Sequence, residues 1–220
     1  MGLREIKSAR TRQRMIAVAV ELFLEQGYDD TTMEQIAERA EVGTTTLYRY
    51  FPTKDLLLLD RVVRGMDLGE RMRGRPADEP VGEALTAVLR EAAADFDAPD
   101  LRIPEIRQLV DVAPVPRARL WDFHLSARTQ LEAALADRMG RPASDLSVRL
   151  TASFALEVLV ISDELRRARD YAPSASASLE EVLAGLPGSE IILPATGRAN
   201  AVSTSPGAPA VRSTSRSPAT

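Results

Sequence analysis

Residues 31–54 constrain the fold more than any other part of this chain, because they contain two short helical patterns joined by a tight turn. Ile36 and Ala37 give the first pattern an apolar face, and Ala40 continues that face one turn later. Small alanines allow a second helix to cross at close range. The segment therefore predicts a helix-turn-helix.

The second helix of this unit is expected to carry an exposed polar face. With Leu47 turned inward, a period of 3.6 residues places Thr45 and Arg49 on the opposite side. Hydroxyl, phenol and cationic side chains gather at the starts of this helix and of the next one, where unpaired N–H groups attract anions. These candidates for binding double-stranded DNA are Thr32, Thr44, Thr45, Thr46, Tyr48, Arg49, Tyr50 and Lys54.

The same side chains also have a purely structural interpretation. Thr32 suits the N-cap of a helix, and Glu34 and Gln35 stand where side chains of the first turn could reinforce the cap. Tyr48 and Tyr50 fit half-buried aromatic positions. Capping and packing do not explain why so many phosphate-binding groups occur together, so we favour the DNA interpretation.

Residues 12–66 resemble the N-terminal domain of the TetR (tetracycline-repressor-like) family. The resemblance covers about a quarter of the chain and rests on three motifs, which are Phe23-x-x-x-Gly27-Tyr28, Thr31-Thr32 and Leu47-Tyr48-x-x-Phe51-x-x-Lys54. It implies a ligand-responsive transcriptional regulator, most often a repressor. The family pattern places operator contacts at Thr32, Thr46, Tyr48, Tyr50 and Lys54.

Two departures from the family pattern affect this interpretation. Glu41 stands where the family usually has glycine in the turn, and a left-handed conformation is unfavourable for any other residue. Gly43-Thr44-Thr45 replaces the common Ser-Lys-Gly. They leave an alternative open, in which the chain is a helical interaction module or small-molecule-binding protein that has lost specific DNA binding.

Composition narrows the remaining classes. The 220 residues contain no cysteine and one histidine, which excludes disulfides and argues against a catalytic metal site. No triad, paired-carboxylate or phosphate-cradling glycine pattern is present, so we expect neither an enzyme nor a cofactor. The longest mostly apolar run, residues 150–161, is too short for a bilayer, and no secretory signal is seen. A cytoplasmic protein without a membrane partner is expected.

Helical periodicity along the chain predicts an all-α protein. An N-terminal three-helix unit would be joined by a fourth helix, residues 53–66, to a C-terminal helical bundle. The expected domains are a basic flexible arm (1–11), a DNA-binding domain (12–66), a ligand-binding and dimerisation domain (67–187) and a disordered tail (188–220). Within the third domain we expect a loop at 67–80 and helices around 85–96, 105–112, 117–138, 144–171 and 178–186, the last capped by Ser178.

Residues 144–171 form a helix that is apolar on nearly every side. In a domain of this size, one face would pack in the core and another against a second subunit, which predicts a homodimer. The alternative is the central helix of a monomeric bundle. A dimer suits a palindromic operator, because two copies present two recognition helices.

The effector is expected to be a small, mostly apolar molecule held in the second domain. Aromatic and polar side chains give the candidate lining as Phe96, Trp121, His124, Phe154 and Glu157. Two of these have competing structural interpretations, since Glu157 could be paired with an arginine and His124 could be an ordinary core residue.

Overall fold

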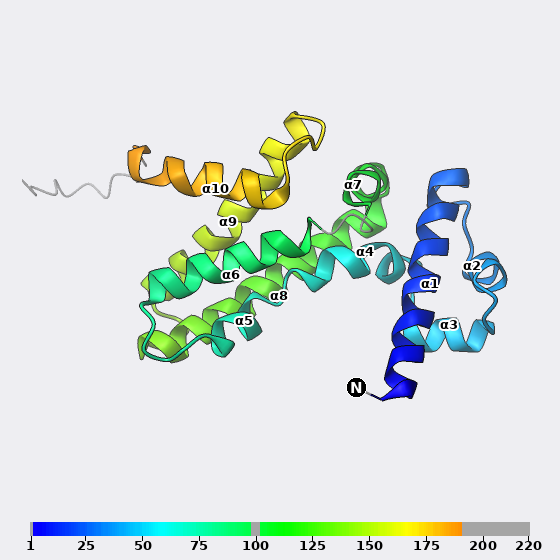
Figure 1. Cartoon of the computed structure of the whole chain (residues 1–220), viewed down its shortest axis with the longest axis horizontal. Helices are drawn as coiled ribbons and strands as arrows, with labels where there is room; N and C mark the ends of the chain where they lie inside the picture. Colours follow the sequence, from blue (N-terminus) through cyan, green and yellow to red (C-terminus); the bar gives the residue numbers. More distant parts are fainter. Residues whose placement is uncertain (1, 98–101, 191–220) are drawn as a thin grey trace, which may run out of the picture. The chain divides into compact units, whose positions relative to one another are not determined.

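The computed structural model describes residues 2–97 and 102–190, and these residues form helices and connecting turns without a strand (Figure 1). This confirms the all-α prediction. One compact unit spans Met1–Pro187. Most of the predicted tail, residues 191–220, lies outside the described residues. Among the described residues, no helix has the length and apolarity needed to cross a bilayer.

Ten α-helices and a final 3-10 turn are described. In chain order they are α1 (Leu3–Gln26), α2 (Met33–Arg39), α3 (Thr44–Tyr50), α4 (Lys54–Arg64), α5 (Leu68–Gly74), α6 (Val81–Asp95), α7 (Ile103–Val112), α8 (Pro114–Met139), α9 (Leu146–Ala168), α10 (Ala175–Gly185) and η2 (Leu186–Gly188).

Helix α1 begins much earlier than the sequence predicted. Residues 3–11, expected as a flexible arm, form its first turns, and the backbone N–H of Gly2 donates to Glu5 Oε2 at 2.8 Å. Arginine and lysine are good helix formers, and an acid in the first turn suits the helix dipole. Ser8 also hydrogen-bonds Tyr50 of α3 at 2.7 Å, so the helical arm contacts the third helix. As predicted, α1 stops at Gly27, whose φ is +91°.

The turn between α2 and α3 holds Glu41 in the left-handed region, at φ +54°. Two hydrogen bonds close the end of α2, from Glu41 N–H to Glu38 O at 3.0 Å and from Val42 N–H to Ala37 O at 3.0 Å. This is a Schellman arrangement, which normally uses glycine at the position of Glu41. The chain therefore keeps the tight turn despite the substitution, at a cost in backbone strain.

Helix α5 replaces the loop predicted at 67–80. Leu68 and Met72, one turn apart, are buried against the second core, which supplies the stabilisation that the short segment lacks by itself. Gly69 allows close contact with α8, because a Cβ atom there would lie 2.5 Å from the carbonyl oxygen of Gln130. Glycine was interpreted as a loop signal, although here it marks a helix crossing.

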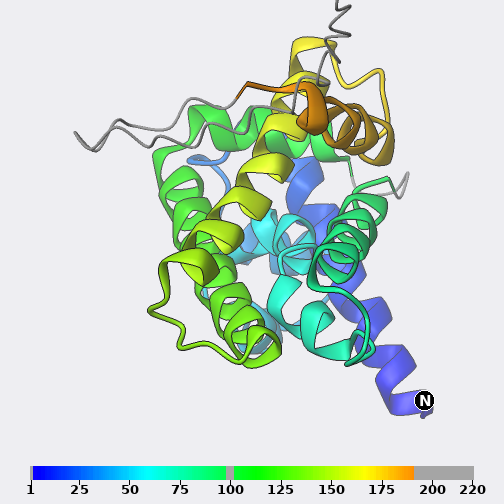
Figure 2. The same cartoon turned by 90° about the vertical axis from the view of Figure 1, so that its left-hand side faces the viewer.

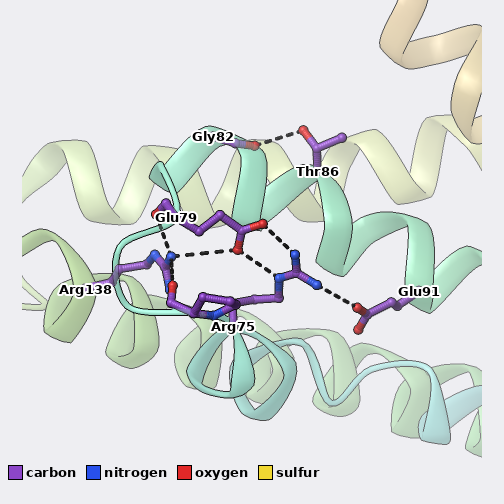
Figure 3. Close-up of polar contacts among 7 residues, drawn as sticks. Arg75, Glu79, Gly82, Thr86, Glu91 and Arg138 are labelled. Atoms are coloured by element: carbon purple, nitrogen blue, oxygen red, sulfur yellow. Dashed lines mark hydrogen bonds and ion pairs between the residues drawn. The ribbon is translucent and has the colours of Figure 1, made fainter.

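A network of charges fastens the connection between α5 and α6 to α8 (Figure 3). Arg75 pairs with Glu79 through two hydrogen bonds of 2.5 and 2.9 Å and reaches Glu91 at 3.2 Å. Arg138 of α8 donates to the backbone carbonyls of Pro76 and Glu79 at 2.5 and 2.6 Å. These contacts hold the turn in place without an apolar core of its own.

Two apolar cores organise the helices. The first contains buried residues of α1 to α4 together with α7, and the second contains residues of α5, α6, α8, α9 and α10. Figure 2 shows α5, α6, α8 and α9 around this second core. Met66 and Phe96 pack against both cores, so they lie where the two meet. The domain boundary expected at residue 66 stays a prediction. Helix α7, which follows that position in the chain, packs with the N-terminal helices in the first core.

Helix α10 starts earlier than predicted and uses a different cap. Ser174 accepts from the N–H of Ala177 at 3.0 Å, and Asp97 accepts from the N–H groups of Ala175 and Ser176 at 2.5 and 3.1 Å. Ser178, the predicted cap, is fully buried inside the helix. Ser174 and Ser178 both suit an N-cap in sequence, and the burial of Ser178 in the folded protein leaves this role to Ser174.

Candidate DNA-binding face and ligand cavity

The polar face predicted on α3 is exposed. Thr44, Thr45, Tyr48 and Arg49 all reach the surface, while Leu47 is completely buried. Helical geometry explains this arrangement, because Leu47 fixes which side of the short helix faces the core. These four side chains form the part of the predicted DNA-binding set that the structure brings together on one element.

Thr32 caps α2 and is exposed at the same time. Its hydroxyl oxygen accepts from the N–H of Gln35 at 3.2 Å, and Gln35 Oε1 accepts from the N–H of Thr32 at 2.8 Å. The predicted cap at Thr32 is therefore present, and Gln35 completes it as a capping box. Because the hydroxyl of Thr32 is an acceptor in this bond, its own proton remains able to donate to a phosphate.

Thr46 and Tyr50 differ from the exposed set. Both are half-buried, and the phenol of Tyr50 is engaged with Ser8 of α1. The guanidinium of Arg49 lies 5.7 Å from the centre of the Tyr50 ring. Tyr50 thus holds α3 against α1, the structural interpretation that the sequence had left open.

Lys54 is the clearest departure from the predicted DNA contacts. Its Nζ donates to three backbone carbonyls, those of Tyr28 at 2.6 Å, Asp29 at 3.1 Å and Thr31 at 3.1 Å. It also lies 4.4 Å from the centre of the Tyr28 ring. An ammonium group has three donors, so all of them are used inside the protein. We therefore correct the assignment of Lys54 from a phosphate ligand to a clamp on the loop before α2.

Asp55, the next residue of α4, connects the N-terminal helices to α8. Its carboxylate is only 4% exposed and accepts from Arg119 Nε at 3.0 Å. Burial, followed by the charges of Asp55 and Asp29, raises the pKa of the Tyr28 phenol above its ordinary value. A buried carboxylate requires a partner, so Arg119 stabilises the start of α4.

A cavity of about 280 Å³ lies between the end of α4 and the helices of the second core. Its apolar lining includes Val62, Met66, Phe96, Leu120 and Leu156. Helix α4 contributes directly to this wall. Small-molecule sites in proteins have this character, with a mostly apolar lining and a few placed polar groups.

Three of the five predicted lining residues border the cavity, namely Phe96, Trp121 and His124. Phe154 and Glu157 do not, and both are exposed on the outer face of α9. The prediction was wrong for Phe154 and Glu157. In the sequence, α9 has apolar residues on every side, and only the packing shows which side faces the cavity. Glu157 therefore needs no buried partner within one chain.

His124 presents a hydrogen-bonded imidazole to the cavity. Its Nδ1 lies 2.9 Å from the carbonyl oxygen of Leu120 one turn earlier, and its ring is 5.9 Å from that of Trp121. Burial lowers the pKa of His124 and outweighs the opposing effect of the bond to Leu120. With Nδ1 donating, Nε2 is left as an acceptor.

Charged residues on one side of the cavity were missed in the sequence. Arg107 of α7 donates to Asp163 of α9 at 2.6 Å, while Arg167 lies 3.4 Å from Asp111. These pairs join α7 and α9, which are far apart in sequence. Charges on amphipathic helices usually indicate solvated faces, and no local pattern in the sequence separates the charged residues beside the cavity from those on the surface.

Comparison with known proteins agrees with the N-terminal architecture. Residues 15–60 match the family model described as bacterial regulatory proteins, tetR family. The HTH-type transcriptional regulator TcmR of Streptomyces glaucescens is 41% identical over 91 residues, which are 40% of this chain and 40% of that protein. The HTH-type transcriptional repressor KstR of Rhodococcus jostii is 35% identical over 81 residues, 36% of this chain and 38% of that protein.

The likeness in fold extends further than the likeness in sequence. The transcriptional regulator FadR from Bacillus subtilis, solved in complex with stearoyl-CoA, matches with a TM-score of 0.54 and 21% identity, over 79% of this chain and 96% of that one. The matched relatives thus share under half of their length with this chain, and the solved structure shares its helical fold. The match over residues 15–60 and these relatives identify the N-terminal part of the chain as a domain of the tetR family of bacterial regulatory proteins.

Proposed function

We propose that this protein is a ligand-responsive transcriptional regulator, acting in the cytoplasm as a homodimer on a palindromic DNA operator. A small, mostly apolar effector in the cavity would release it from DNA. One observation carries the proposal. Helix α4 borders the cavity near its end, at Val62, and through Lys54 at its start holds the loop that leads into the helix-turn-helix.

The exposed side chains of α2 and α3 suit an operator. Threonine methyl groups and tyrosine ring edges can contact thymine methyls in the major groove, and Arg49 can pair with a phosphate or with guanine. We propose Thr32, Thr44, Thr45, Tyr48 and Arg49 as the contacts. The retained turn at Glu41 supports this function over the alternative in which DNA binding has been lost.

The outer face of α9 supports dimerisation. Leu146, Leu150, Phe154 and Ile161 recur at helical spacing and are exposed by 71, 59, 45 and 39%. These exposed apolar side chains share the outer face of α9 with Glu157, and an exposed apolar surface of this kind is typical of an interface. A dimer would also supply the two recognition helices, about 34–36 Å apart, that successive major grooves require.

The sense of regulation follows from the relatives. KstR is named as a repressor, and the FadR structure holds stearoyl-CoA. We propose repression relieved by ligand for this chain on that basis.

Selection of binding sites from a random DNA library, followed by electrophoretic retardation at two salt concentrations, tests the proposal. We expect a palindromic site, and Thr45→Ala should lose about 1–3 kcal/mol at particular base pairs. Thr129→Ala, an exposed threonine on α8, is the matched control and should bind like wild type. A site without two-fold symmetry, or equal binding by the two variants, would contradict the assignment.

Light scattering tests the dimer. Leu150→Glu introduces a charge among the exposed apolar residues of α9 and should yield monomers. Val112→Glu charges a valine at the end of α7 that is more exposed, 79% against 59%, and should leave the dimer intact. A monomeric wild-type protein at micromolar concentration would refute the proposed interface.

A further inference from the structure

Arg166 is a buried cation in the cavity wall. Arg166 is only 7% exposed, and it lies on α9 among the residues that line the cavity. Its Nε donates to the carbonyl oxygen of Pro173 at 3.3 Å, and its guanidinium carbon lies 5.5 Å from the centre of the Tyr171 ring. Neither partner carries a negative charge.

The two arginines that contact Asp163 differ from Arg166 in this respect. Arg107 forms an ion pair with Asp163, and Arg167 lies within ion-pair distance of both Asp163 and Asp111. These charges therefore neutralise one another. Within residues 2–97 and 102–190, no carboxylate forms an ion pair with Arg166.

A buried guanidinium without a counter-ion is costly, because its desolvation is not repaid by a paired charge. A guanidinium also has five N–H donors in a planar fork, and the bond to Pro173 uses one of them. The remaining donors match the two oxygens of a carboxylate, which they can bind side by side. A negatively charged group bound next to Arg166 would therefore supply the counter-ion that this arginine lacks among the described residues.

We infer that the effector is a compact apolar acid whose carboxylate pairs with Arg166. This inference rests on the proposed function, because it takes the cavity as the effector site. A single uncompensated cation matches a monoanion better than a phosphate, which carries nearly two charges at neutral pH. The cavity, at about 280 Å³, lies just below the usual range for ligand sites, so the apolar part of the acid is small.

Pairs of acids and amides with the same carbon skeleton test the inference. Octanoate, decanoate and 2-naphthoate would be compared with octanamide, decanamide and 2-naphthamide, with Trp121 emission and thermal melting as readouts. Trp121 is the only tryptophan and borders the cavity. At least one acid should bind ten or more times tighter than its amide, because only the carboxylate can form charge-assisted hydrogen bonds with the guanidinium in which both groups are charged.

Arg166→Met should abolish this preference for the acid. Arg169→Met is the control, since Arg169 follows the same helix, is exposed and pairs with Glu181 at 2.6 Å. Without ligand, Arg166→Met should melt within about 3 °C of wild type, because it removes an unpaired charge. If Arg166 were mainly structural, the variant would melt much lower.

The inference is overturned if none of the acids binds, if acids and amides bind equally, or if Arg166→Met keeps the preference. Operator binding by the ligand-free protein is measured separately. A protein that binds acids and fails to bind DNA would refute the proposed regulator while leaving the acid site standing. A protein that binds its operator and ignores every acid would refute the acid site alone.

Discussion

Replacing Lys54 with methionine distinguishes a clamp from a phosphate ligand. Methionine keeps the apolar stem of the side chain and removes the ammonium group. In the structure that group holds the carbonyls of Tyr28, Asp29 and Thr31, which belong to the connection between α1 and α2. The substitution therefore leaves three acceptors without their donor and frees the loop that positions the helix-turn-helix.

The loss can be worked from these contacts. A hydrogen bond to a charged group contributes about 1.5–3 kcal/mol, and an exposed cation–π contact about 0.5–1 kcal/mol. The three bonds share one cation, and the bond to Asp29 is exposed, so their contributions are not additive. We expect a loss of about 2–4 kcal/mol in the free energy of unfolding. For a chain of this size that lowers Tm by roughly 4–16 °C.

Thermal melting and salt-dependent DNA binding together decide between the two roles. A phosphate ligand would leave Tm unchanged, weaken binding to every sequence and reduce the salt slope by about 1. Arg49→Met is the comparison, because Arg49 is exposed on α3 and should show that second pattern. If Lys54→Met melts within 1 °C of wild type and loses one unit of salt slope, the clamp is wrong.

Two further predictions concern strain and protonation. Glu41→Gly should raise the free energy of unfolding by about 0.5–1 kcal/mol, because glycine adopts the left-handed conformation without strain. Only the exposed ion pair between Glu41 and Arg14 is lost. Chemical denaturation measures the change in stability, and a destabilised variant would disprove the strain at Glu41. Burial holds the pKa of His124 below 6.5, so below that pH the unfolded chain takes up the proton first and stability falls. His124→Gln should flatten this decline in melting curves recorded between about pH 5 and 7, and identical pH profiles would count against it.

The helix-turn-helix could be predicted from sequence because its signals are local. The period of apolar residues identifies α2 and α3, Thr32 and Gln35 form the capping box that their spacing suggests, and Gly27 ends α1. In each case the residues that carry the signal lie within a few positions of one another. Helix geometry alone then determines which side chains are exposed.

Contacts between distant segments were the part that sequence could not supply. Lys54 has the residue type of a phosphate ligand, and only the approach of residues 28–31 shows that its donors are occupied. Arg166 resembles any other arginine near the end of a helix in sequence, and only the structure shows that it borders the cavity and forms no ion pair with a carboxylate of the described residues. Gly69 indicated a loop for the same reason, since the backbone of Gln130 is invisible in the local sequence.

Ion pairs fasten helix α4 to the helices on either side of it. Arg12 of α1 pairs with Asp60 in α4 and also lies 4.5 Å from the centre of the Phe51 ring, just after α3. At the start of α4, Asp55 pairs with Arg119, the residue directly before the cavity residues Leu120 and Trp121. Helix α8 therefore contacts both the cavity and the start of α4.

These contacts make bending within the DNA-binding helices costly, so a ligand that displaces α8 should turn them as one body. The junction at Gly65 and Met66 is the place left to accommodate the motion, and a Cβ atom on Gly65 would lie 2.6 Å from the Phe96 ring. A tenfold loss of operator affinity requires a preference of only about 1.4 kcal/mol for the displaced arrangement. A few buried apolar contacts, at about 25 cal/mol per Å², supply that amount, so the proposed regulation demands no large rearrangement of either core.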